Sequence, residues 1–144
     1  MKTNFNPVKD INLKSNMKTS EIIRELSTSG GFMAKNLATV VEILVEMVNN
    51  KNCLKFLSFP AAPISTGLRG VFKEIIKRKL VDVIITTCGT LDHDIARCSK
   101  NYYEGDFNFD DTVVYKQGYH RLGNILIPID SYGPLLENKL QPFL

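Results

Sequence analysis

The chain has 144 residues, a formal net charge of +3 and a hydrophobic content of 44%. This length suits a single domain, and the apolar content is enough for a packed core, which excludes wholesale disorder. The weak charge, without a dense stripe of Lys and Arg interleaved with aromatics, excludes nucleic acid as the expected partner. No run of about 18 apolar residues occurs, so we expect no membrane span.

Cysteine usage and the N-terminal residues indicate the compartment. The three cysteines, Cys53, Cys88 and Cys98, are odd in number and have no CxxC spacing. This pattern argues against a disulfide framework and favours a reducing compartment. Residues 1–18 are polar, rich in Asn and Lys, and lack the apolar segment of a secretory signal. We therefore predict a cytoplasmic protein with an extended or partner-bound arm at residues 1–18.

Two helices are predicted to follow the arm. The first begins at Ser20, an N-cap candidate, and ends before Ser29-Gly30-Gly31. In the second, apolar residues recur at helical spacing, and Asn49-Asn50 ends the pattern. The recurring residues are Leu37, Val40, Val41, Leu44, Met47 and Val48. This stripe is typical of a core-facing helix and does not by itself indicate a cofactor site.

The middle of the chain predicts a βαβ unit. Residues 53–59 are expected to form a strand, residues 67–80 an amphipathic helix, and residues 81–87 a second strand. The second strand is a β-branched run with few polar interruptions, which is typical of a parallel strand buried on both faces. Strand, helix and strand in this order form a right-handed crossover, so the predicted class is α/β with a parallel sheet and flanking helices.

The last third of the chain has a weaker pattern. Residues 100–120 are polar and aromatic with no clean period, and we expect irregular structure with a short strand at residues 113–115. A strand at residues 124–129 and a short helix after Pro134 complete the predicted order of elements.

Two loops follow the two strands of the βαβ unit, at residues 60–67 and 86–94. In an open parallel sheet, ligands bind outside the carboxyl ends of the strands, so we expect both loops to line one ligand site. Small residues in the first loop allow a ligand to approach the backbone, and its hydroxyls precede a helix N-terminus that attracts phosphate. In the second loop, Asp92, His93 and Asp94 are expected to open the next helix.

Each of these features has a simpler interpretation. Ser65 and Thr66 are also typical helix caps, and Asp92 and Asp94 are typical first-turn acids. Cys88 and His93 are a nucleophile pair by residue type alone. With Cys98 they form a trio whose spacing matches no standard zinc pattern, so we predict no metal. The sequence contains neither GxGxxG nor a Walker A motif, so a standard nucleotide fingerprint is absent.

Seven short segments in order resemble the deoxyhypusine synthase family. They are Gly31-Phe-Met-Ala-Lys-Asn-Leu37, Phe56-Leu-Ser-Phe59, Ile64-Ser-Thr-Gly-Leu-Arg69, Val81-Asp-Val-Ile-Ile-Thr-Thr-Cys-Gly89, Leu91-Asp-His-Asp94, Arg121-Leu-Gly-Asn124 and Ile127-Pro128. The resemblance implies a Rossmann-like parallel sheet, NAD as cofactor and a tetramer with active sites between subunits. It also implies transfer of the aminobutyl group of spermidine, through a lysine of the enzyme, to one lysine of eukaryotic translation initiation factor 5A, which is the first stage of hypusine biosynthesis.

The resemblance also implies roles for individual positions in both loops. The residues that correspond to NAD contacts are Ala61, Ala62, Ser65, Thr66, Thr87, Cys88, Gly89 and His93, and those that correspond to spermidine contacts are Asp92 and His93. Compared with animal enzymes, Ala61-Ala62 stands in place of Ser-Asn, Cys88 in place of alanine, and His93 in place of a second glutamate. A carboxylate pairs with ammonium groups, whereas a neutral imidazole only accepts a hydrogen bond and a protonated one repels them.

The resemblance covers the first half of the family and ends with this chain. The family's catalytic lysine lies downstream in a Gly-rich segment followed by Lys-His, which this sequence lacks. We therefore predict an N-terminal arm at residues 1–18 and the N-terminal half of the NAD-binding domain at residues 19–144. That half is expected to be incomplete without a second chain, which comes from a separate gene or from cleavage of a precursor. Two alternatives stay open: a non-catalytic regulatory paralogue and a homospermidine synthase-like transferase with a free polyamine as acceptor.

Overall fold

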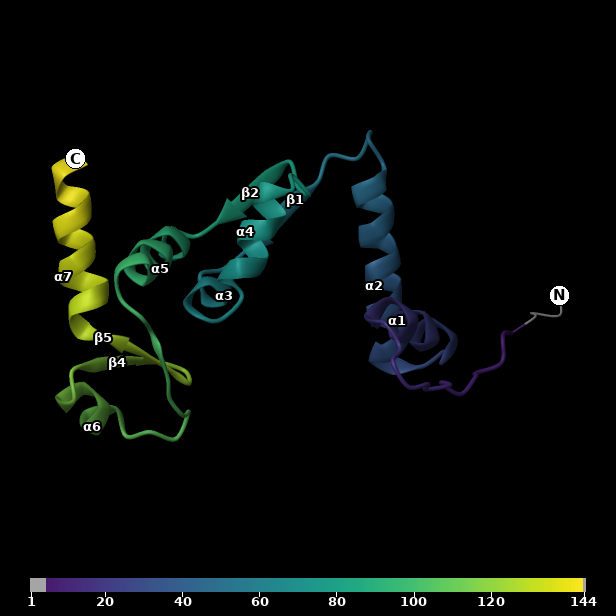
Figure 1. Cartoon of the computed structure of the whole chain (residues 1–144), viewed down its shortest axis with the longest axis horizontal. Helices are drawn as coiled ribbons and strands as arrows, with labels where there is room; N and C mark the ends of the chain where they lie inside the picture. The colour runs from purple at the N-terminus through teal and green to yellow at the C-terminus, as the bar shows by residue number, and fades with distance from the viewer. Residues whose placement is uncertain (1–4, 144) are drawn as a thin grey trace. The chain divides into compact units, whose positions relative to one another are not determined.

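The computed structural model describes residues 5–143 and divides into two compact units, Met1–Cys53 and Leu54–Leu144 (Figure 1). Each unit is described by itself. Residues 1–4 of the predicted arm, and Leu144 at the end of the predicted domain, lie outside the described residues.

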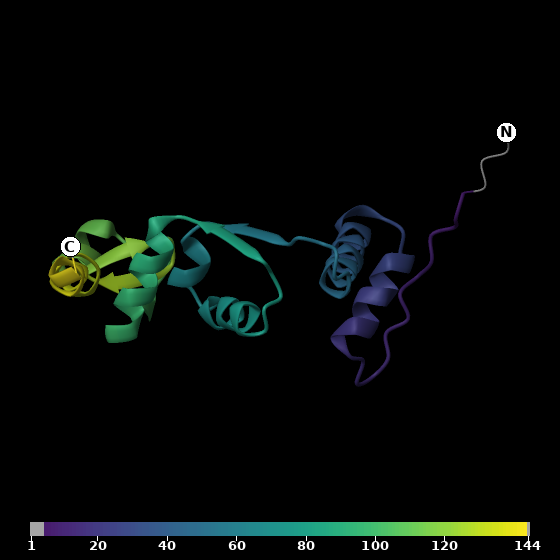
Figure 2. The same ribbon diagram turned by 90° about the horizontal axis from the view of Figure 1, so that it is seen from above.

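The first unit contains two helices, α1 (Thr19–Thr28) and α2 (Phe32–Asn49). Helix α1 begins just before the predicted cap, Ser20, because the Lys18 backbone N–H donates to Glu21 Oε2 at 2.7 Å. Helix α2 ends at Asn49, as its apolar spacing predicts. The arm runs along α1 (Figure 2), with the Asn12 N–H donating to the Glu25 carboxylate at 3.1 Å. Residues 5–14 of the arm have no regular secondary structure, and residues 15–16 form a turn in which Asn16 has φ +65°.

The second unit opens with the predicted βαβ crossover. Strands β1 (Phe56–Phe59) and β2 (Val83–Thr86) pair in parallel, with Phe56 opposite Val83. Between them lie a single helical turn, α3 (Ala62–Ser65), and the amphipathic helix α4 (Arg69–Lys77). Both strands and the helix are shorter than predicted, and the first loop contains the turn α3. This part of the α/β prediction is confirmed at the level of a two-stranded parallel sheet with helices.

The prediction that the second strand is buried on both faces is wrong for this chain. The side chains of Ile84 and Ile85 point to opposite faces of β2, and they are 37% and 56% exposed. The reason is that the parallel sheet has two strands among residues 5–143, so β2 lacks a second neighbouring strand there. The β-branched sequence of β2 is suited to burial on both faces, but this chain leaves the side chains of Ile84 and Ile85 partly exposed.

Helix α5 (Cys88–Ser99) follows β2 directly, with Thr87 at its N-cap. Asp92 and Asp94 therefore lie in the second turn, so the prediction that Asp92, His93 and Asp94 open this helix is wrong. After α5, an antiparallel sheet has the strand order β3-β5-β4, built from β3 (Tyr103–Glu104), β4 (Tyr119–Leu122) and β5 (Ile125–Pro128).

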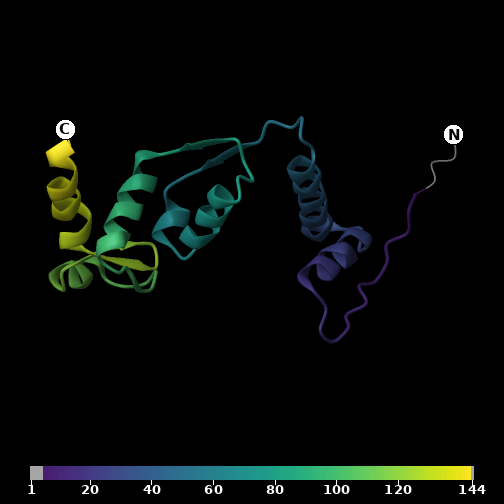
Figure 3. The ribbon, with the colours of Figure 1, turned by 45° about the horizontal axis from the view of Figure 1, so that its top comes forward.

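Two helices frame this antiparallel sheet. Residues 113–115 lie in helix α6 (Asp111–Lys116) and not in a strand, because the Asp110 carboxylate caps the helix by accepting from the N–H groups of Thr112 and Val113. Helix α7 (Ile129–Leu140) begins before Pro134 and continues through it into a 3₁₀ turn at Gln141–Phe143. Packing of α7 beside α5 outweighs the helix-breaking tendency of proline there (Figure 3).

Few apolar side chains of the second unit are buried. They are Ile64 on α3, Ala96 on α5, Val114 on α6 and Ile127 on β5. Helix α5 is central because it contacts both α3 and α7. Among the described residues, no helix combines the length and apolar character needed to cross a bilayer.

The β4–β5 turn provides a test of the fold. Gly123 has φ +62°, and a Cβ there would lie 3.1 Å from the Phe107 ring. We expect Gly123→Ala to lower the free energy of unfolding by about 1–2 kcal/mol, because an L-residue is strained in this conformation. Urea denaturation followed by circular dichroism measures the change.

Gly133→Ala is the matched control. Gly133 lies inside α7, and a Cβ there meets no atom within 4 Å. Its replacement is expected to stabilise the protein by about 0.5–1 kcal/mol, because alanine loses less backbone entropy in a helix. Equal effects of the two variants would contradict the turn geometry.

Candidate functional site

The two loops that follow β1 and β2 lie against each other. A Cβ on Gly89 would lie 3.0 Å from the Cβ of Ala61, so only a glycine lets the loops approach this closely. The Thr86 hydroxyl donates to the Phe59 carbonyl at 2.7 Å and lies 2.6 Å from Oγ1 of Thr90. These contacts bring residues of both predicted loops together at the carboxyl edge of the parallel sheet.

Two of the predicted ligand-binding hydroxyls take part in the local structure. Ser65 is 2% exposed and donates to the Ala62 carbonyl at 2.8 Å, and Thr66 donates to the Pro63 carbonyl at 3.0 Å. Both hydroxyls therefore close the turn α3. They do not cap α4, whose N-cap is Leu68. Their oxygens keep lone pairs, but their protons are engaged within the turn.

The exposed part of the candidate site is the start of α5. Thr87 and Cys88 are exposed, as is Ala62 in the first loop, whereas Gly89 is half-buried. The first turn of α5 has no acidic side chain, and the first N–H groups of a helix lack intrahelical partners. The small residues at the start of α5 leave its backbone open to close approach by a ligand. The partial positive charge of the helix N-terminus favours an anionic group such as the diphosphate of a dinucleotide.

Arg97 supports the first loop and was not singled out from the sequence. Its Nη1 donates to the carbonyls of Ile64 and Thr66 at 2.6 and 2.5 Å. These two bonds join α5 to the end of α3, so one side chain sets the distance between the loops. The sequence shows only that Arg97 follows Cys88 by nine positions. No spacing rule predicts its contact with residues 64–66.

The three polar residues of the second loop have different surroundings. Asp94 forms an ion pair with Arg69, and the same guanidinium donates to Cys98 Sγ at 2.8 Å. Asp92 is half-buried and interacts with the hydroxyl of Tyr132. His93 lies on the side of α5 that faces α7, where its ring packs against Tyr132.

His93 is enclosed by two tyrosines. It is 8% exposed, its Nδ1 lies 2.9 Å from the Tyr102 hydroxyl, and its ring centroid lies 4.8 Å from that of Tyr132. Burial lowers the pKa of His93, and the positive charge of Arg97 adds to that shift, while the negative charge of Asp92 opposes it. The imidazole is therefore neutral at pH 7.

Both tyrosines keep their protons. Burial raises the pKa of Tyr102 to about 12. Burial also raises the pKa of Tyr132, followed by the negative charges of Asp92 and Cys88 and by a hydrogen bond with Asp92. The Tyr132 hydroxyl on α7 therefore stays protonated in the neighbourhood of Asp92.

No metal-binding group is formed by residues 5–143, since no three His, Cys, Asp or Glu side chains come together there. Cys88, at the first position of α5, and Cys98, beside Arg69, have separate surroundings. A negative charge on Cys88 contributes to the raised pKa of Tyr132. The Cys88 thiol is not among the groups that act on the His93 imidazole.

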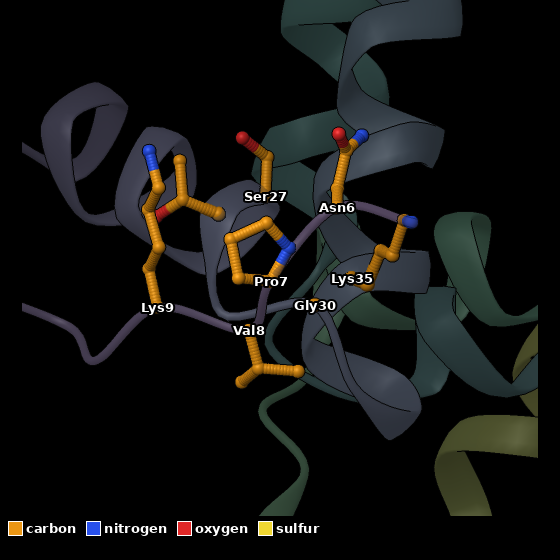
Figure 4. Close-up of a pocket in the computed structure, with 8 residues that line it drawn as sticks. Asn6, Pro7, Val8, Lys9, Ser27, Gly30 and Lys35 are labelled. Atoms are coloured by element: carbon orange, nitrogen blue, oxygen red, sulfur yellow. The ribbon is translucent and has the colours of Figure 1, made fainter. Parts of the chain in front are cut away.

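Two hollows are formed by the described residues. In the first unit, a pocket of about 480 Å³ is formed where the arm crosses the end of α1 (Figure 4); its labelled residues are Asn6, Pro7, Val8, Lys9, Ser27, Gly30 and Lys35.

In the second unit, a groove of about 940 Å³ runs between α4 and α5, with Phe59, Phe72 and Leu91 among its apolar residues. It is also lined by Gly67 of the first loop and Thr90 of the second, so it borders the loop site. Neither hollow is lined by Asp92 or His93.

Comparisons with known proteins give one consistent result. A family model for deoxyhypusine synthase matches residues 21–144. The chain is 54% identical over 138 residues to the "Probable deoxyhypusine synthase" of Picrophilus torridus and 47% identical over 138 residues to that of Thermoplasma acidophilum. Each alignment covers 96% of this chain and 44% of the relative, so the chain spans less than half the length of these curated relatives.

A solved structure is also similar in part. The crystal structure of a candidate deoxyhypusine synthase from Entamoeba histolytica matches with a TM-score of 0.49 and 20% sequence identity. The match covers 77% of this chain and 45% of that chain.

The role of Arg97 can be tested by Arg97→Met, which keeps the length of the side chain but removes its donors. We expect the free energy of unfolding to fall by about 1–3 kcal/mol, because two carbonyls at the end of α3 lose their partner. Urea denaturation measures the loss. Arg78→Met is the control: Arg78 pairs with Glu74 on the exposed side of α4, and removing such a pair costs about 0.5 kcal/mol or less.

The burial of His93 predicts a pH dependence of stability. Its folded-state pKa lies below the ordinary 6.5, so as the pH falls below about 6.5 the unfolded chain takes up the proton first. Stability from this group is complete above pH 6.5 and is lost as the pH falls through the folded-state pKa. We expect His93→Phe to reduce this dependence between pH 7 and 5. Parallel curves for wild type and His93→Phe would contradict the burial of the imidazole.

Proposed function

The chain belongs to the deoxyhypusine synthase family, and we propose that it is the N-terminal part of an active, NAD-dependent deoxyhypusine synthase. The enzyme would transfer the aminobutyl group of spermidine to one lysine of eukaryotic translation initiation factor 5A. The observation that carries this proposal is the close approach of the two strand-end loops, where Gly89 meets Ala61. That contact brings the two loops together at the positions where the family resemblance expects NAD and polyamine.

The start of α5 is the proposed diphosphate site of NAD. Thr87 and Cys88 are exposed there, and the first turn carries no acidic side chain that would repel phosphate. Ala61 and Ala62 limit the bulk of the first loop, while Ser65 and Thr66 hold its shape through their bonds within α3. When bound, NAD supplies the hydride acceptor for oxidation of spermidine.

Asp92 is the proposed partner of a polyamine ammonium group. It lies one turn into α5, behind the proposed diphosphate site, and is half-buried. Asp94 is unsuited to this role because Arg69 already neutralises it. A single carboxylate next to the cofactor would hold the end of spermidine close to the reacting carbon.

The rest of the enzyme would complete the site. The catalytic lysine is expected outside this chain, either further along one polypeptide or on a second one, and a tetramer-like assembly is expected in the cytoplasm. The apolar surface of the second unit supports such a partner: Phe56 is 57% exposed, and the groove between α4 and α5 has an apolar lining. Exposed strands of this kind are normally covered by further sheet or helix.

A regulatory paralogue is the second candidate. Ala61 and Ala62 offer no side-chain hydrogen bonds to NAD, and His93 is buried where the family resemblance expects a ligand contact. A homospermidine synthase-like activity is the third, and it differs only in the acceptor of the aminobutyl group.

One incubation separates these candidates. The chain, together with the remainder of its enzyme, is supplied with NAD and with spermidine labelled in its four-carbon unit. The acceptor is either the factor or putrescine. We expect label on the factor. Label on putrescine alone would favour homospermidine synthesis. Turnover that persists when NAD binding to this chain is blocked would favour a regulatory subunit.

The role of Asp92 is tested by Asp92→Asn. Loss of a charged hydrogen bond costs about 1.5–3 kcal/mol, so we expect the KM for spermidine to rise at least roughly tenfold with the KM for NAD little changed. Asp94→Asn is the matched control, because Asp94 is already paired with Arg69. Equal increases for both variants would contradict the assignment to Asp92.

A further inference from the structure

We propose that helix α2 pairs with the α2 helix of a second copy of this chain, antiparallel and about a two-fold axis. The contact surface is an apolar line of side chains, here called the α2 seam, which consists of Met33, Leu37, Val40, Leu44 and Met47. This inference goes beyond the proposed function and does not rest on it, because it involves no residue of the two strand-end loops.

Within the first unit, α1 covers a different side of α2 (Figure 3). On that side Ala38 is fully buried, and Ala34 and Val41 are half-buried. These three side chains recur at helical spacing and are short, so the two helices can approach closely. Among residues 5–53 the chain forms no further helix and no strand, so the rest of α2 has no covering element in this unit.

The α2 seam lies on an open side of the helix. Leu37, Val40 and Leu44 are 48%, 51% and 51% exposed, and Met33 is 73% exposed. Ile43, next to the seam, is 50% exposed. The spacing predicts a helix side that packs against a core, but the described part of the first unit supplies no core there. An apolar patch that extends along a whole helix marks an interaction surface.

The spacing within the α2 seam indicates that the partner is a helix. Successive seam residues are separated by four, three, four and three positions. Alternating intervals of three and four place the side chains on one line along an α-helix. Side chains on such a line pack between those of a second helix at a shallow crossing angle.

The order of the side chains favours a second α2 as that helix. The seam has the order Met, Leu, Val, Leu, Met in either direction of the chain, so an antiparallel copy presents the same series of sizes. A two-fold interface needs this self-complementarity, because residue i contacts residue j of the partner and residue j contacts residue i. Antiparallel pairing also places the positive N-terminus of each helix beside the negative C-terminus of the other.

The charges on α2 are compatible with the same partner. Lys35, Glu42 and Glu46 are exposed on the side of the helix opposite the seam. A partner helix with charged flanks would bury those charges against apolar side chains without a counter-charge, whereas a second α2 buries none. The residues that flank the seam are all uncharged: Ala34, Asn36, Val41, Ile43 and Val48.

Single charges in the seam test the pairing in the complete enzyme, which is this chain together with the remainder of its enzyme. We expect Leu37→Glu and Leu44→Lys each to halve the assembled mass, because every two-fold interface then buries two unpaired charges. Sedimentation velocity measures the mass. Glu42→Lys is the matched control, because it changes a charge on the opposite side of the same helix and should leave the mass unchanged.

Mixed assemblies test the identity and the direction of the partner. In an antiparallel pair, residue 37 of one copy lies near residue 44 of the other. Co-expression of the Leu37→Glu and Leu44→Lys chains should therefore restore the wild-type mass, with an ion pair at one end of the interface and two leucines at the other. Co-expression of Leu37→Glu with Leu37→Lys chains should not restore it, because each charge then faces a leucine.

Three results would overturn the proposal. Unchanged mass with lower thermal stability in both single variants would show that the remainder of the same enzyme covers the seam. Restoration only by the Leu37→Glu and Leu37→Lys mixture would show a parallel pair. Failure of both mixtures to restore a reduced mass would show that a second copy does not contact the seam.

A milder variant decides the outcome if the charged variants do not accumulate. Val40→Thr keeps the shape of the central seam residue and adds a hydroxyl. We expect the dissociation constant of the assembly to rise at least roughly tenfold, because a two-fold interface buries two such hydroxyls. An unchanged dissociation constant would overturn the pairing.

Discussion

The parallel pairing of β1 with β2 determines where every candidate ligand group lies. The register from Phe56 opposite Val83 to Phe59 opposite Thr86 makes both strands end at the same edge. The loops that follow are therefore neighbours, and the start of α5 points out from that edge. The hydroxyl of Thr86 and the guanidinium of Arg97 then fix the loops to each other and to α5. A shift of this register would move Ala61 away from Gly89 and separate the two halves of the site.

Much of this arrangement follows from local pattern. The helical spacing of α2, the β-branched run of β2 and the order strand–helix–strand all predicted elements that the structure contains. The adjacency of the two loops follows from parallel topology alone. The pattern did not predict which hydrogen bonds individual side chains make. Ser65 and Thr66 were expected to offer hydroxyls to a ligand or to cap the next helix. Their hydroxyls close the turn before that helix, so the capping expectation is wrong.

The other differences arise from individual contacts, the first of them local. The β-branched and aromatic residues Val113, Val114 and Tyr115 favour a strand, but one capping carboxylate at Asp110 makes them helical. Pro134 predicts a helix start, but contact with α5 extends α7 in the N-terminal direction to Ile129. The enclosure of His93 depends on Tyr102 and Tyr132, which come from outside its helix, and no spacing rule connects them. Strand β4 was missed although Gly123-Asn124 between two strand-like segments is a typical two-residue hairpin turn.

The contact between Gly89 and Ala61 has a consequence for variation in this family. The two positions crowd each other, since a Cβ added at residue 89 would lie 3.0 Å from the Ala61 Cβ, closer than ordinary van der Waals contact. A larger side chain at one position therefore requires the other loop to give way. The sizes of the two side chains are coupled, although the two residues follow different strands. A larger side chain in the first loop must turn away from Gly89, so the glycine of one loop limits what the other loop can present.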